Sequence, residues 1–133
     1  MKTKQTDESY EGLEFFTKKG GRFANAKITI TERFSFLFSS GFCHMANLEN
    51  KDYVRLAYYP KTSEIFFDFT EDKDAEGVFK LLHRGAPAFT TCQSFFKANY
   101  LNKDQVVGSY SPHKKRIPKI GEVWFIKLDE KVQ

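Results

Sequence analysis

The sequence lacks the features that mark secreted and membrane-spanning proteins. It has only two cysteines among its 133 residues, whereas a secreted domain of this size usually carries a disulfide framework. No stretch approaches the ~18 uninterrupted apolar residues of a helical membrane span, and residues 1–12 lack the apolar stretch of a secretory signal. We therefore expect a cytoplasmic protein with no membrane partner. A disulfide between Cys43 and Cys92 stays open, because both are expected near the start of a short helix.

Sequence signatures of catalysis and of metal binding are missing as well. Cys43 and His44 are neighbours, but His83 and His113 are far from them in sequence, and no paired CxxC spacing occurs. A Cys–His nucleophile pair would need a third group and an oxyanion site, which the sequence does not signal. No glycine-rich phosphate loop occurs either. We therefore expect that the protein is not an enzyme and that it holds no cofactor or metal ion.

Phenylalanine, by contrast, is abundant. The chain contains 15 Phe and is 41% hydrophobic and 17% aromatic, which is enough for a packed core in one domain of this length. Aromatic residues favour strands, and the apolar positions alternate, Ile28 with Ile30 and Phe34 with Phe36 and Phe38. A period of two is typical of a strand with one buried face. These patterns predict a β-rich domain.

One stretch of the sequence occurs twice. Residues 46–60, ANLENKDYVRLAYYP, return as residues 98–112, ANYLNKDQVVGSYSP, with eight of fifteen positions identical. Self-similarity of this kind indicates two units with a common structure. The surrounding patterns predict the order strand, strand, short helix, strand, strand in each unit. We place the first unit at 27–70 and the second at 78–128, joined by the acidic linker 71–77.

The short helix of each unit has recognisable start and stop signals. Ser39 or Ser40 can cap the first helix, and Asn47 can end it in the left-handed conformation. In the second unit, Thr91 and Asn99 take the same two roles. The sequence Asn-Lys-Asp that follows is expected to turn the chain from helix to strand in both units.

The doubled unit predicts how the domain is assembled. Outside the units, residues 1–26 form an N-terminal tail and a hairpin strand, and residues 129–133 form a C-terminal tail. A single unit of roughly 45 residues cannot bury enough apolar surface and leaves its sheet edges open. Pairing about a twofold axis closes the edges, and fusion in one chain makes the pairing intramolecular. The predicted fold is mainly β with two short helices, arranged as a pseudo-twofold β-barrel.

This order of elements, with a helix closed at Asn47 or Asn99 and an Asn-Lys-Asp turn after it, resembles the AbrB/MazE swapped-hairpin family. The tandem two-unit form is similar to the MraZ arrangement within that group. In the family, two units interlock into a barrel that binds DNA through basic residues on one face. The resemblance implies DNA-facing roles for Arg33 and Arg84, the arginines that occupy the matching first turns of the two units.

Positive charge is concentrated near the C-terminal end. The net charge is +4, and the last hairpin of the second unit carries a basic insertion at 113–121. This insertion holds four cations and no acid: Lys114, Lys115, Arg116 and Lys119. Such side chains bind phosphates independently of base sequence. A solvated hairpin tip would have the same composition.

A second basic turn lies near the amino terminus, and an acidic stretch lies in the middle of the chain. Lys18, Lys19 and Arg22 flank Gly20-Gly21 and are further candidates for nucleic-acid contacts. Residues 68–77 hold five acids and one lysine. The acidic linker or the basic insertion could address a complementary protein surface.

These features favour a non-enzymatic DNA-binding protein, a small AbrB-like transcriptional regulator with double-stranded DNA as its partner. Two alternatives remain. One is a protein-interaction module, such as an adaptor or an inhibitor of another protein. The other is a single-stranded nucleic-acid binder that stacks bases on exposed aromatic residues, with Tyr58, Tyr59 and Tyr110 as candidates. Pairing of the chain into a homodimer also stays open.

Overall fold

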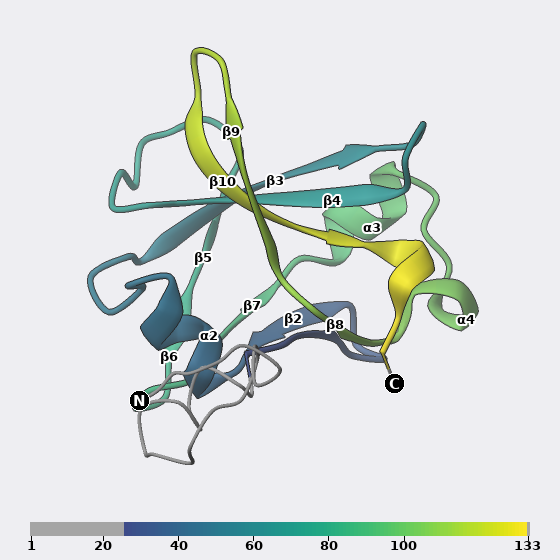
Figure 1. The fold of residues 1–133 in the computed structure, drawn as a ribbon, viewed down its shortest axis with the longest axis horizontal. Helices are drawn as coiled ribbons and strands as arrows, with labels where there is room; N and C mark the ends of the chain where they lie inside the picture. Colours follow the sequence, from purple (N-terminus) through teal and green to yellow (C-terminus); the bar gives the residue numbers. More distant parts are fainter. Residues whose placement is uncertain (1–25, 133) are drawn as a thin grey trace, which may run out of the picture.

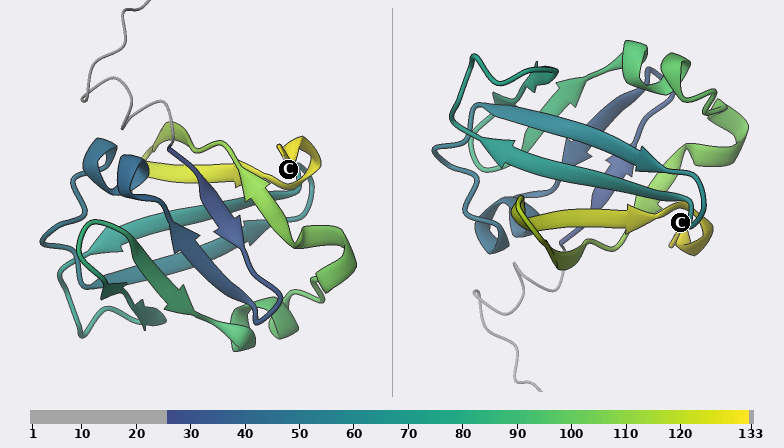
Figure 2. Two further views of the ribbon diagram at one scale, coloured as in Figure 1. Left: turned by 90° about the horizontal axis from the view of Figure 1, so that it is seen from below. Right: turned by 90° about the horizontal axis from the view of Figure 1, so that it is seen from above.

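Two antiparallel sheets form the frame of the molecule. The computed structural model describes residues 26–132. Within this range ten strands form two five-stranded sheets, which Figure 2 shows as two layers whose strands cross. The predicted mainly β class is confirmed. The expected basic turn at Lys18, Lys19 and Arg22 lies outside the described residues.

The first layer, sheet A, contains β1 and β2 of the first unit and β6, β7 and β8 of the second. Its hydrogen-bonded order is β6-β7-β2-β1-β8, with bounds Leu82–His83, Ala88–Thr91, Ser35–Phe38, Ile28–Ile30 and Gly108–Tyr110. In β1 the outer residues Ile28 and Ile30 are fully buried and Thr29 between them is partly exposed. The alternation in the sequence thus correctly predicted the inward face of this strand.

The second layer, sheet B, contains the longest strands. Its order is β5-β3-β4-β10-β9, with bounds Val78–Lys80, Tyr53–Tyr59, Glu64–Thr70, Gly121–Lys127 and His113–Ile117. Figure 1 shows the β9–β10 hairpin extending beyond the rest of the sheet. Sheet B therefore carries the segment that the sequence marked as basic.

Three short helices and one 3-10 turn connect the strands. They are α2 (Ser40–Met45), α3 (Gln93–Ala98), α4 (Lys103–Val106) and the turn η2 (Leu128–Glu130). Ser39 caps α2 as expected, because its side chain accepts a hydrogen bond from the Phe42 amide. Two helices were expected, and α4 is the addition. No helix within residues 26–132 has the length and apolar character needed to cross a membrane.

Phenylalanine rings fill the space between the two sheets. Phe36 and Phe38 of β2 are fully buried, and their ring centroids lie 4.9 and 5.6 Å from that of Phe67 on β4, both in edge-on geometry. Phe42 of α2 closes one end of this core with its ring 5.1 Å from Trp124 on β10. The aromatic cluster thus joins both layers and both units.

The two units meet at the centre of each sheet. In sheet A, β2 pairs with β7, and in sheet B, β4 pairs with β10; each pair joins strands that hold the same place in the two units. Only Leu81 separates β5 from β6, and only two residues separate β8 from β9, so the chain passes from one sheet to the other on both sides. The strand ladders nevertheless remain two open sheets, and closure into the expected barrel is not confirmed.

The duplicated sequence does not fold as a duplicate. Residues 53–59 form strand β3, whereas the matching positions in the second copy begin in helix α4 and reach strand β8 only at Gly108. Asn102, expected in a turn toward a strand, instead caps α4 by accepting a hydrogen bond from the Asp104 amide. The prediction that Asn-Lys-Asp leads directly into a strand is therefore correct for the first unit and wrong for the second.

The helix ends also differ from the expectation. Asn47 adopts the predicted left-handed conformation with φ of 56°, but Asn99 does not, and Tyr100 takes that conformation with φ of 55°. The N-cap position of the second helix is Cys92, whose side chain forms no capping hydrogen bond, rather than Thr91, which is the last residue of β7. The helical parts of the two units are thus one residue out of step with the gap-free alignment of the two sequences.

Candidate nucleic-acid interface

The basic insertion is a strand rather than a loop. β9 covers His113–Ile117 and pairs with β10 in antiparallel register, with Lys114 opposite Trp124 and Arg116 opposite Glu122. The hairpin turns between Ile117 and Gly121, where Ile120 donates its amide hydrogen to the Ile117 carbonyl at 3.0 Å. β9 is the outer strand of sheet B, so the basic side chains lie on a sheet edge.

Alternation along β9 divides its two lysines between opposite faces of the hairpin. The Lys114 Nζ lies 3.7 Å from Glu122 Oε1 and 5.4 Å from the centroid of the Trp124 ring. The Lys115 Nζ instead lies 5.9 and 5.7 Å from the ring centroids of Phe66 and Phe125. Lys114 is therefore partly neutralised by a carboxylate, whereas the contacts of Lys115 are with aromatic faces.

Two further cations complete the hairpin. The side chains of Arg116 and Lys119 are exposed and make no hydrogen bond or ion pair with any residue in the described part of the chain. Lys119 sits in the turn with φ of 72°, which directs the chain back into β10. With Lys115, they give the hairpin three positive charges that are not neutralised within residues 26–132.

A groove runs along the outer face of sheet B beside this hairpin. Its volume is about 710 Å³, and its lining is mostly apolar. Strand residues Ala57, Phe66 and Val123 form its base, and the turn residues Pro118 and Ile120 line it where the hairpin extends. We call it the sheet B groove.

Charges of both signs line the sheet B groove. Lys115 and Arg116 line it from the hairpin, while Glu64 and Glu76 line it from β4 and the acidic linker. Glu64 is only 8% exposed. Glu64 was not among the residues predicted from the sequence, although the alternation in EIFFDF places it on the same face as Phe66.

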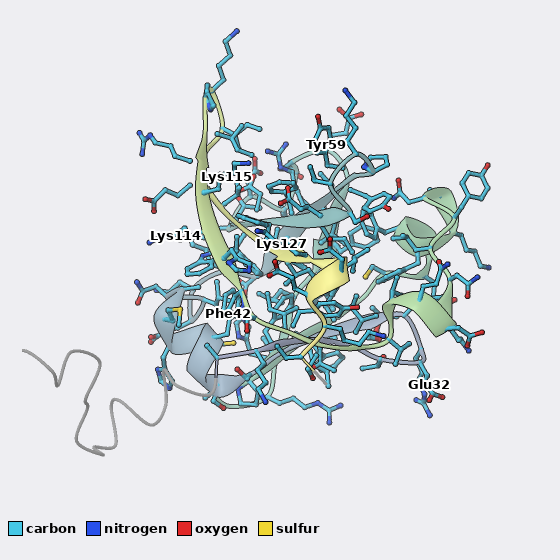
Figure 3. The ribbon with its side chains drawn as sticks, turned by 45° about the vertical axis from the view of Figure 1, so that its right-hand side comes forward. Glu32, Phe42, Tyr59, Lys114, Lys115 and Lys127 are labelled. Atoms are coloured by element: carbon cyan, nitrogen blue, oxygen red, sulfur yellow. The ribbon has the colours of Figure 1, made fainter. Side chains whose placement is uncertain are left out.

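The two arginines suggested by the family resemblance are not part of this site. Arg33 lies in the turn between β1 and β2, and Arg84 lies in the turn between β6 and β7. Because β2 and β7 are antiparallel neighbours, these turns lie at opposite ends of sheet A. Figure 3 shows Glu32, the neighbour of Arg33, on the far side of the molecule from Lys115. The structure brings neither arginine to the hairpin.

Only one of the three tyrosines proposed for base stacking is well exposed. Tyr59 at the end of β3 is 47% exposed and lines the sheet B groove. Tyr110 is fully buried and donates its hydroxyl hydrogen to the Val106 carbonyl, so its candidacy was wrong. Tyr58 packs against the core. Figure 3 shows Tyr59 and Lys115 in the same upper part of the molecule.

The cysteines are buried free thiols. Burial raises the pKa of Cys43 to about 11, with a small opposing effect from the Ala88 backbone, and raises that of Cys92 to about 12. Neither thiol therefore has thiolate character at neutral pH. Within the described range, no three His, Cys, Asp or Glu side chains are grouped so that they could hold a metal ion.

Comparison of the chain with protein-family models, with curated proteins and with solved structures gives no match.

Proposed function

We propose that the chain is a non-enzymatic protein that binds double-stranded DNA through its β9–β10 hairpin, as a small transcriptional regulator. The proposal includes a pseudo-twofold, barrel-like assembly of the two units. This assembly is supported by the pairing of β2 with β7 and of β4 with β10. Of the contacts expected from the sequence, the proposal keeps those of the hairpin at the edge of sheet B and leaves out Arg33 and Arg84 in the turns of sheet A.

The observation that carries the proposal is the shape and charge of the hairpin. A two-stranded antiparallel ribbon fits the major groove of B-form DNA, which is about 12 Å wide. The β9–β10 ribbon projects from the sheet (Figure 1), and it presents Lys115, Arg116 and Lys119 without a carboxylate partner among residues 26–132. Lysine and arginine on such a ribbon bind phosphates by releasing counterions.

The number of free cations gives a measurable expectation. If three phosphates are contacted, the slope of log K against log salt is about −2.7, and affinity falls about 40-fold between 50 and 200 mM salt. Lys114 adds less, because Glu122 already lies 3.7 Å from its ammonium group. A much steeper slope would require cations outside the hairpin.

Neutralising the three free cations together tests the proposal. Fluorescence anisotropy with a labelled mixed-sequence duplex is expected to show weaker binding and an almost flat salt dependence for a Lys115→Gln, Arg116→Gln, Lys119→Gln variant. A variant with Lys27→Gln, Lys61→Gln and Lys97→Gln removes the same charge from other exposed positions and is expected to keep the slope of the unchanged protein. Equal behaviour of both variants, or no duplex binding at low salt, would contradict DNA binding by the hairpin.

A protein-interaction module is the second candidate, and the open edge of β9 supports it. An outer strand can accept a partner strand by backbone pairing, and lysines on such an edge also protect against unwanted pairing. In that case, loss of the three cations is expected to promote self-association, which sedimentation velocity measures, without changing duplex binding. This outcome would favour the interaction module over the DNA-binding protein.

A further inference from the structure

The carboxylate of Glu64 lies at the sheet B groove and has no partner among residues 26–132. The residue is 8% exposed, its side chain forms no hydrogen bond or ion pair with the rest of residues 26–132, and its carboxylate oxygens keep access to solvent. Glutamate side chains that are mostly buried are usually paired in folded proteins, and this one is not. An unpaired carboxylate at a groove is therefore suited to a donor supplied from outside.

Two cations on the same face of sheet B as Glu64 are engaged elsewhere. Lys127 is its register partner on β10, but the Lys127 Nζ lies 3.8 Å from Glu130 Oε2. Arg55 donates two hydrogen bonds to Asp68, at 3.1 and 2.8 Å. Neither cation lies within ion-pair distance of Glu64. The carboxylate oxygens of Glu64 can therefore accept hydrogen bonds from a ligand.

The surroundings of Glu64 are apolar and aromatic. Phe66, two residues along β4, lies with its ring centroid 5.2 Å from that of Phe125, and the short side chain of Ala57 stands opposite Phe66 on β3. Tyr59 is the register partner of Glu64 and is 47% exposed. A planar ring placed over Phe66 or against Tyr59 would gain stacking contacts.

The hairpin side of the same groove is positively charged. Lys115 and Arg116 line it, and the Lys115 ammonium lies over the Phe66 ring at 5.9 Å. A suitable ligand must therefore offer an anion at the hairpin, a flat apolar ring at the base and a hydrogen-bond donor for Glu64. A nucleotide whose base carries an amino group offers all three, because its phosphate, base and exocyclic amino group are held in one unit.

We propose that the sheet B groove binds one unpaired base of a nucleic-acid strand, with its amino group donating to Glu64 and its phosphate at Lys115 and Arg116. The inference rests on the proposed function. It adds the recognition of one unpaired base to the phosphate contacts made by the hairpin. A groove of about 710 Å³ lies within the range of small-molecule sites, about 300–1,000 Å³. Carboxylates accept from the cytosine amino group, and thymine has no amino group. Cytosine is therefore expected to bind better than thymine.

The test compares duplexes that differ in one unpaired nucleotide. The probes are a blunt duplex and the same duplex with a single 5′-overhanging cytosine, thymine or abasic site, measured by anisotropy at fixed salt. The overhanging cytosine is expected to tighten binding about tenfold over the blunt duplex, which is the scale of one stacked base, and the thymine is expected to tighten it less. Equal affinity for all four probes would overturn the inference while leaving duplex binding by the hairpin intact.

Two variants separate the groove from the hairpin. Glu64→Gln is expected to abolish the preference for cytosine over thymine and to leave blunt-duplex affinity unchanged. Ala57→Trp fills the base of the groove and is expected to remove the gain from any overhanging base. Circular dichroism checks that both variants fold. Retention of the cytosine preference by both folded variants would overturn the inference.

Failure of the proposed function gives a different pattern. If the blunt duplex does not bind, the same groove is tested with the short single strands (dC)5 and (dT)5. A preference for (dC)5 that Glu64→Gln removes would support the base site without the duplex site. Absence of that preference would overturn both.

Discussion

Thr90 has a buried hydroxyl group that no neighbour satisfies, and replacing it by valine is expected to stabilise the fold. The residue lies on β7 opposite Phe36 of β2 and is 0% exposed. Its Oγ1 has no hydrogen-bond partner within residues 26–132. Desolvation of an unpaired hydroxyl costs about 1–3 kcal/mol in proteins. Valine has nearly the same shape and removes the unpaired group.

We expect Thr90→Val to raise the free energy of unfolding by about 1–2 kcal/mol. For a domain of this size, each kcal/mol corresponds to about 3–5 °C in Tm. Urea unfolding followed by circular dichroism measures the first quantity, and calorimetry measures the second. An unchanged urea m-value would show that the effect is on stability rather than on the compactness of the unfolded chain.

The neighbouring Thr91 is a matched control. It is exposed, and its hydroxyl lies 3.3 Å from the Ser35 hydroxyl. Thr91→Val removes this hydrogen bond and is therefore expected to lower the free energy of unfolding by about 0.5–1.5 kcal/mol, the opposite sign from Thr90→Val. If Thr90→Val destabilises the protein, or if both variants stabilise it equally, the packing assigned to the β2–β7 pair is wrong.

Two further predictions concern backbone strain and alkaline stability. Tyr100 is 92% exposed with φ of 55°, so Tyr100→Gly is expected to stabilise the protein by about 1 kcal/mol; a gain from Tyr100→Ala, which keeps the Cβ, would contradict this. Burial raises the pKa of Cys43 to about 11 and those of Cys92 and Tyr110 to about 12. In the unfolded chain these groups ionise at lower pH than in the folded protein, so rising pH favours the unfolded state. The free energy of unfolding measured in urea is therefore expected to be constant below about pH 9 and to decline between pH 9 and 12. Constant stability to pH 12 would refute these shifts.

Most strands of the fold could be predicted because their alternation reports burial directly. The fully buried positions Phe36 and Phe38 stand two apart, and Leu37 between them is 44% exposed. Ser39 was identified as a cap because a serine directly before a helical stretch satisfies an amide at the helix start. These signals are local and need no knowledge of the partner strand.

The second copy of the repeat could not be predicted in the same way. Val54 and Val106 hold equivalent positions in the sequence and are both buried, yet one lies in a strand and the other in a helix. β3 is held in a ladder by β4 and β5, whereas the segment after Asn102 has no strand beside it until β8 pairs with β1. Tertiary pairing therefore contributes to the different conformations of two segments that share eight of fifteen residues.

The candidate site was partly predicted. The basic character of 113–119 was evident from composition, but its strand conformation depends on pairing with β10. The groove beside it was not foreseen, since it requires β3, β4 and β10 to lie side by side with the hairpin. Glu64 could have been suspected, because a glutamate on the same face as Phe66 departs from an apolar pattern.

Amide chemical-shift mapping tests the hairpin interface most directly. A ¹⁵N-labelled sample is titrated with an unlabelled duplex at low salt, and the perturbed residues are placed on the structure. The account predicts that the largest changes lie on β9 and β10, around Lys115 and Arg116, with little change at the turns of Arg33 and Arg84. Changes centred on those two turns, or no change at any residue, would contradict it.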